Sequence, residues 1–155
     1  MDQLPTGATE ISGVPFGVPN DVLMHMSVNN RRGMTYGMTH RGFVTMWKLW
    51  DEFGIADSDM HGYWEDDPVI TLDQEEVYAT SFIKEGKVLV AIGNWRSEPV
   101  NVKMNIDWKR LKMNPKEVTI FAPEMKDYQE DRSFKVGESI PVGSKSDCLL
   151  IISKK

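Results

Sequence analysis

The second half of the chain is a series of short, strand-length stretches separated by turns, and this pattern restricts the fold more than any other feature. The stretches "VYATSFI" (77–83) and "VLVAI" (88–92) flank a turn at Glu85-Gly86, where glycine tolerates the positive φ that tight hairpins need. Further strand-like stretches lie at 100–106, 117–121, 133–136, 139–142 and 148–152. Short strands at this spacing predict an antiparallel β-sandwich over residues 66–155.

The stretch "VNVKMNI" (100–106) alternates between apolar and polar residues. This alternation predicts a single half-buried strand with one face toward solvent. The next stretch, "DWKRLKMNP" (107–115), predicts one helical turn that ends at Asn114-Pro115, because proline disfavours helix in the residue before it.

Residues 1–65 follow a different pattern and form the first of two predicted domains. One good helix is expected at 43–53, with Gly54 placed as its C-terminal cap. Three- and four-residue steps put five apolar side chains on one face of this helix: Phe43, Met46, Trp47, Trp50 and Phe53. The residues before the helix are rich in glycine and proline and show no sustained periodicity. We interpret residues 1–65 as a short α/β piece of something larger.

Composition excludes several classes of function. With 155 residues, 41% of them hydrophobic, the chain is long enough to bury a core, and its net charge of −5 gives no footprint for nucleic acid or an anionic membrane. No apolar run approaches the roughly 20 residues of a membrane-spanning helix. The single cysteine, Cys148, excludes an internal disulfide or a Cys-rich zinc site, and its place in "CLLII" predicts a core thiol.

The sequence contains no motif for catalysis, a cofactor or a metal. Asp51 and Glu52 are adjacent, but helical neighbours point about 100° apart and do not face one site, so we interpret them as surface carboxylates. A small enzyme that combines Asp51, Glu52, Asp59 and His61 is the least favoured hypothesis. The three histidines are too far apart in sequence to form a local metal motif.

Aromatic side chains are the best candidates for ligand binding, since an aromatic face can stack on a sugar ring but can equally fill a core. Trp47 and Trp50 share the apolar helix face, which favours packing. Tyr63 and Trp64 in "HGYWED", and Trp95 at the end of "AIGNW", are the candidate substrate-binding residues.

Taken in order, several stretches resemble the C-terminal end of glycoside hydrolase family 123-like proteins. These are bacterial proteins, best known from Bacteroidetes and often described as uncharacterised glycoside hydrolase domain proteins. The resemblance covers nearly the whole chain and rests on "EISGVPFGVPNDVL", "RRGMTYGMTHR", "WKLWDEFGIADSDMHGYWEDDPVIT", "VYATSFIKEGKVLVAIGNW", "NIDWKRLKMNPKEVTIFAPEMKDYQEDRSFKVGESIPV" and "CLLIIS".

In that family a (β/α)8 barrel carries out catalysis and a C-terminal β-sandwich packs against it. A complete barrel needs roughly 250 residues, so the resemblance implies that residues 1–65 are a remnant of the last barrel elements. The apolar helix face would then meet a barrel domain or a second chain. Catalysis in the family is substrate-assisted and uses an adjacent Asp-Glu pair on an earlier barrel strand. No position of this chain matches that pair, so no catalytic residue is carried over.

The expected function is therefore that of a non-catalytic C-terminal portion that supports a sugar-cleaving barrel and is inactive alone. The alternative is a free-standing carbohydrate-binding β-sandwich that uses Tyr63, Trp64 and Trp95. Neither hypothesis requires a cofactor. The expected location is cytoplasmic if Met1 is the true start, and outside the cytoplasm if the chain belongs to a longer, exported protein.

Overall fold

The structure is a computed structural model that describes residues 48–125, 129–144 and 146–155. These residues are mainly β, and all the paired strands are antiparallel. The strands are β1 (Asp59–His61), β2 (Ile70–Leu72), β3 (Val77–Lys84), β4 (Lys87–Asn94), β5 (Val100–Val102), β6 (Met104–Ile106), β7 (Val118–Ala122), β8 (Arg132–Phe134), β9 (Ile140–Val142) and β10 (Asp147–Lys154). Residues 48–53 are helical, and short helical segments are η1 (Ile55–Asp57), α5 (Trp108–Leu111) and η2 (Pro115–Glu117).

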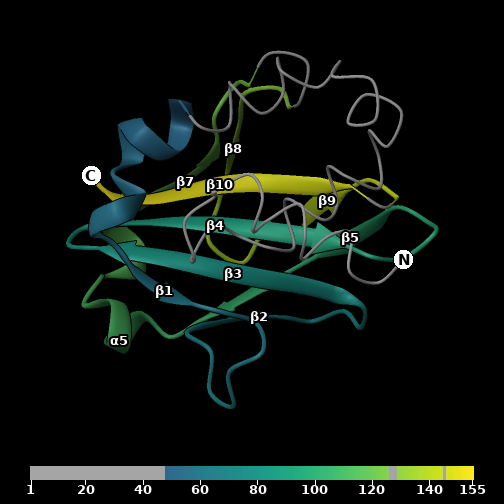
Figure 1. The fold of residues 1–155 in the computed structure, drawn as a ribbon, viewed down its shortest axis with the longest axis horizontal. Helices are drawn as coiled ribbons and strands as arrows, with labels where there is room; N and C mark the ends of the chain where they lie inside the picture. The colour runs from purple at the N-terminus through teal and green to yellow at the C-terminus, as the bar shows by residue number, and fades with distance from the viewer. Residues whose placement is uncertain (1–47, 126–128, 145) are drawn as a thin grey trace, which may run out of the picture.

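The largest sheet has six strands in the order β1-β3-β4-β10-β7-β8. At its centre is the predicted hairpin: β3 and β4 pair from Val77↔Asn94 to Lys84↔Lys87, and Gly86 takes a φ of 77° in the turn between them. The C-terminal strand β10 lies between β4 and β7, so three long strands run side by side across the molecule (Figure 1).

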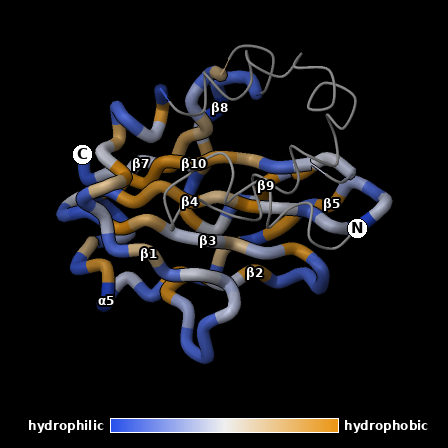
Figure 2. The backbone as a smooth tube through the Cα atoms, viewed as in Figure 1, coloured by the Kyte–Doolittle hydropathy of each residue, from blue (hydrophilic) through white to orange (hydrophobic). Residues whose placement is uncertain are grey.

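Two small sheets, β2-β6 and β5-β9, complete a second layer. Between the layers lies a continuous apolar core, to which the large sheet contributes alternate residues such as Val88, Val90 and Ile92. The small sheets contribute Ile70, Val102, Ile140 and Val142 to the same core. Figure 2 shows the hydrophobic colour concentrated along β4, β7 and β10. This is the antiparallel β-sandwich predicted from the sequence.

The opposite face of the large sheet is also apolar and is covered by the helical residues 48–53. Leu49, Trp50 and Phe53 pack there, and the last two side chains are each only 4% exposed. The sheet side of this second cluster consists of Phe82, Leu89, Ala91 and Leu149, with Met125 beside them. We name this packed surface the helix seat.

The helix seat corrects one part of the predicted partner face. Trp50 and Phe53 were expected to meet a barrel or a second chain, yet both are buried within this chain against its own sheet. An apolar stripe on a helix shows that something covers it but does not identify what. The other members of the predicted face, Phe43, Met46 and Trp47, lie outside the described residues.

The end of the helix follows the prediction. Gly54 adopts the left-handed conformation with φ 76°, and its N–H donates to Trp50 O at 2.9 Å. The chain then enters β1, which pairs with β3 at the edge of the large sheet. The helical residues 48–53 therefore cover the large sheet, and β1 is one of its strands, although both precede residue 65. The division of the chain into two domains at residue 65 stays a prediction.

The stretch 100–106 differs from its prediction, because it forms two strands in two different sheets. β5 pairs with β9, whereas β6 pairs with β2. The change of partner occurs at Lys103, whose N–H donates to the Asp73 side chain at 2.7 Å while its carbonyl accepts from the Asp73 N–H at 3.3 Å. The helical turn that follows is confirmed as α5, and its N-cap Asp107 accepts a hydrogen bond from the Arg110 N–H.

Candidate functional site

The adjacent carboxylates Asp51 and Glu52 lie exposed on the helix, on the side away from the helix seat. Glu52 has one charged neighbour, Lys48, at 3.9 Å. Both side chains are exposed to solvent, and neighbouring positions on a helix do not face one site, so the pair is not arranged for shared acid–base chemistry. The interpretation of this pair as surface carboxylates is confirmed.

An aromatic cluster forms beside the large sheet where the loop after β1 meets β3. The rings of Tyr63 and Trp64 meet edge to face, with centroids 5.2 Å apart and an interplanar angle of 81°. The Tyr63 ring also packs on Tyr78 of β3, with a centroid distance of 4.7 Å. Trp64 is 52% exposed and Tyr78 is 36% exposed. We name Tyr63, Trp64 and Tyr78 the aromatic platform.

A tight turn at residues 61–65 holds the platform. The Glu65 carboxylate accepts hydrogen bonds from the Gly62 N–H at 3.1 Å and from His61 Nδ1 at 3.0 Å, and the Glu65 N–H donates to Gly62 O at 3.2 Å. The hydrogen bond from His61, followed by that from Gly62, keeps the pKa of Glu65 below its ordinary value despite partial desolvation.

Gly62 is required by the position of the Trp64 ring. A Cβ added to Gly62 would lie 2.4 Å from the indole, which is closer than any real Cβ contact. The indole therefore lies directly against the backbone of Gly62, and a larger residue at this position would displace it.

Trp95, the third candidate residue, lies at the same end of the large sheet. Tyr78 pairs with Gly93 in the β3–β4 register. Two residues after Gly93, the Trp95 N–H donates to Glu76 O at 3.0 Å, so the Trp95 backbone lies beside the start of β3. The indole nitrogen of Trp95 is buried, in contrast to the exposed Trp64 ring. The structure thus brings the three predicted residues to one sheet end, and Tyr78 is the member that the sequence analysis missed.

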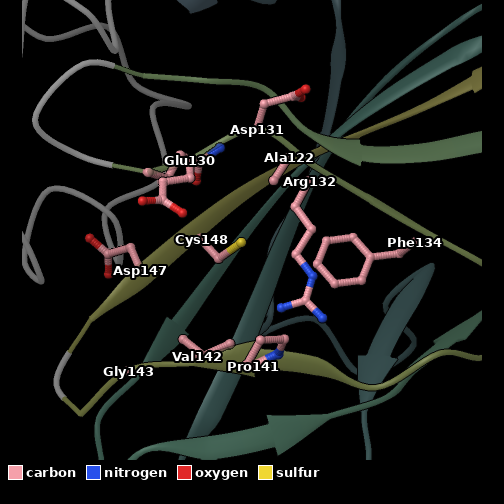
Figure 3. A pocket seen from close by; sticks show the side chains of 11 residues that line it. Ala122, Glu130, Asp131, Arg132, Phe134, Pro141, Val142, Gly143, Asp147 and Cys148 are labelled. Atoms are coloured by element: carbon pink, nitrogen blue, oxygen red, sulfur yellow. The ribbon is translucent and has the colours of Figure 1, made fainter.

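A separate cleft opens between the two layers, near the start of β10 (Figure 3). Its volume is about 270 Å³. Its apolar wall includes Phe134 and Val142, while Arg132 lies with its guanidinium 4.9 Å from the Phe134 ring centroid. The remaining lining comes from Ala122, Gln129, Glu130, Asp131, Pro141, Gly143, Asp147 and Cys148.

The cleft has a mixed polar and apolar lining, and its thiol is not activated as a nucleophile. The Cys148 thiol points toward Arg132 (Figure 3), but burial, with a smaller contribution from the Asp147 carboxylate, raises its pKa to about 12. A thiol with such a pKa is protonated near neutral pH and is a poor nucleophile. In the described ranges, this cleft included, no three His, Cys, Asp or Glu side chains gather as metal ligands. No helix in these ranges is long and apolar enough to span a membrane.

The comparisons with known proteins identify the family. The family model described as glycoside hydrolase 123, C-terminal domain, matches residues 43–153. The chain belongs to this family. The match covers the helix seat, the sandwich, the aromatic platform and the cleft, so the glycoside hydrolase 123 C-terminal domain accounts for all the described residues except the last two. No curated protein matches the chain.

Two solved structures resemble this glycoside hydrolase 123 C-terminal domain over about half of its length. One is the glycoside hydrolase family 30 subfamily 8 xylanase Xyn30A from Clostridium acetobutylicum, with 16% identity and a TM-score of 0.38 over 52% of this chain and 21% of that chain. The other is a GH30 endoxylanase from Clostridium papyrosolvens C71, with 10% identity and a TM-score of 0.37 over 57% of this chain and 24% of that chain. The chain therefore spans about a quarter or less of the length of these enzymes.

Proposed function

We propose that this glycoside hydrolase 123 C-terminal domain is non-catalytic and holds a sugar-cleaving barrel in a fixed position. The observation that carries the proposal is the helix seat. The helix lies where the chain enters the sandwich, so its burial fixes the direction from which any preceding domain arrives.

The contacts of the helix seat are strong enough for this role. Trp50 and Phe53 are almost fully buried against Phe82, Leu89 and Leu149, each at most 1% exposed on the sheet side. Burying one large apolar side chain contributes about 1.5–3 kcal/mol. The Lys87 ammonium also lies 4.8 Å from the centre of the Phe53 ring. A joint of this kind favours a rigid connection over a flexible linker.

The barrel would meet the part of the predicted helix face that precedes the seat. Because Trp50 and Phe53 are occupied by the sandwich, the proposed contacts with the barrel fall to Phe43, Met46 and Trp47. The first part of the apolar helix face would then contact the barrel, and the last part contacts the sandwich.

A complementation experiment tests this function. The full chain is mixed with a family 123 barrel that lacks its own C-terminal domain, and hydrolysis of an aryl N-acetyl-β-galactosaminide is measured. We expect no turnover by the chain alone, and a higher melting temperature and activity of the barrel when the chain is added. Trp50→Ala should abolish this effect, because it empties the helix seat.

Matched variants distinguish a supporting role of the chain from catalysis by the chain itself. Asp51→Asn and Glu52→Gln change exposed carboxylates on the same helix and should leave complementation intact. Turnover by the chain alone that disappears in either variant would overturn the proposal in favour of a small enzyme. A barrel that gains neither stability nor activity from the chain would overturn the supporting role.

A further inference from the structure

We propose that the aromatic platform is a sugar-binding site, in which one face of a neutral pyranose ring stacks on the indole of Trp64. This binding goes beyond the supporting role of the domain and does not depend on it. The proposal rests on the exposure of the ring, on the way the turn holds it, and on the charges around it.

The Trp64 ring is both exposed and fixed in place. Its contact with the Gly62 backbone and its edge-to-face contact with Tyr63 define its orientation, while 52% of the residue remains exposed. A pyranose ring presents a face of C–H groups, and stacking this face on an indole removes apolar surface from water. Because the indole is already held, binding loses little side-chain freedom.

The acidic residues that follow Trp64 in sequence favour an uncharged sugar. Glu65, Asp66 and Asp67 follow Trp64 directly, and Asp66 and Asp67 are exposed. Of these, Asp67 is paired with Arg110 at 3.3 Å. Carboxylates accept hydrogen bonds from sugar hydroxyls but repel an anionic ring, so a neutral hexose is favoured over a uronic acid.

The size of the platform favours a sugar over a protein partner. In the described parts of the chain, the exposed large apolar side chains are Trp64 and Tyr78 of the platform and Val136, which is far from them in sequence. A stable protein interface buries about 800 Å² on each partner. Two exposed rings, followed in sequence by acidic residues, are a small surface for that purpose, but they match the footprint of one or two sugar rings.

The experiment is an NMR titration of the full ¹⁵N-labelled chain with two matched pairs of sugars: galactose with galacturonic acid, and glucose with glucuronic acid. We expect a neutral sugar of at least one pair to shift the indole N–H resonance of Trp64 at millimolar concentrations. The corresponding acid should bind about fivefold more weakly at low salt, the size of one like-charge contact in water.

Three variants localise the binding. Trp64→Ala should abolish the shifts of neighbouring amides. Gly62→Ala should also weaken binding strongly although Trp64 is still present, because the added Cβ displaces the indole. Val136→Ala removes an exposed apolar side chain at a distant place in the sequence and should leave binding unchanged.

The possible outcomes are distinct. Localised shifts that are lost in Trp64→Ala, retained in Val136→Ala and weaker for the acids support the proposal. No response to any of the four sugars, binding that survives Trp64→Ala, or equal binding of both members of each pair would overturn it. None of these results changes the complementation of the barrel, so the failure of one proposal is distinguishable from the failure of the other.

Discussion

The side-chain amide of Gln129 takes the place of a strand beside Leu149. Its Nε2 donates to Leu149 O at 2.9 Å, and its Oε1 accepts from the Leu149 N–H at 2.9 Å. Extending the β7–β10 register beyond the pair Ile151↔Phe121 would put Leu149 opposite Pro123, which has no N–H to donate. Gln129 fills this gap and also donates to Pro123 O at 2.8 Å.

The first prediction follows from this bridge. Gln129→Ala should lower the free energy of unfolding by about 1–3 kcal/mol, because it leaves backbone groups of Leu149 without partners near the core. Chemical denaturation measures the change. Gln74→Ala is the matched control, since in the described structure the Gln74 side chain makes no hydrogen bond, and this variant should stay within about 0.5 kcal/mol of the original chain. Equal stability of the two variants would contradict the structural role of Gln129.

The second prediction concerns Trp50. Trp50→Ala should cost about 3–5 kcal/mol of unfolding free energy, because it opens a cavity in the helix seat. Trp50→Phe should cost far less, because a second aromatic ring keeps most of the packing in the helix seat. Within the described residues the Trp50 indole N–H is buried without a hydrogen-bond partner, and removing such a group offsets part of the lost packing. Thermal and chemical denaturation of both variants test this difference. Similar losses for Ala and Phe would show that the indole itself is required.

Much of the sandwich could be predicted because its strands carry their own pattern. The hairpin of β3 and β4 combines apolar strands with a glycine turn, and both features are local. β1 was missed because three residues, "DMH", show no alternation and form a strand only by pairing with the edge of β3. The break at Lys103 was missed for a related reason, since it depends on Asp73, thirty residues away in sequence.

The candidate site was predicted in its residue types but not in its geometry. Tyr63 and Trp64 are predicted from the stretch "HGYWED", in which Trp64 comes after a glycine and before acidic residues. Tyr78 was not predicted, since an aromatic residue in a strand is typical of core packing. Its contact with Tyr63 at 4.7 Å arises only when β1 and β3 lie side by side. The cleft beside Arg132 was missed because its lining comes from four separate strands, β7, β8, β9 and β10, and the loops between them.

The third prediction concerns the turn that holds the platform. The pKa of Glu65 is lowered in the folded chain, so its ionised form stabilises the turn above the ordinary carboxyl pKa, and this contribution is lost as the pH falls through the lowered value. NMR should show the Gly62 amide and the Trp64 indole N–H shifting together on acidification. Glu65→Gln keeps an acceptor oxygen but cannot ionise, and both resonances should lose most of this dependence. An unchanged acid titration in Glu65→Gln would mean that another group controls the turn.

The fourth prediction concerns Cys148, whose pKa is raised from 9.0 to about 12 by burial. Near pH 8 the thiolate fraction should be roughly a thousandfold lower than in an unfolded chain, so iodoacetamide should label the native protein very slowly and the guanidinium-unfolded protein at the ordinary rate. The folded state retains the thiol proton when the unfolded state begins to lose it near pH 9. Stability should therefore fall as the pH rises above that value. Cys148→Ala should show a shallower decline in chemical denaturation across the same range. Rapid labelling of the native chain, or an identical decline in Cys148→Ala, would show that the thiol is accessible to ionisation at the mouth of the cleft.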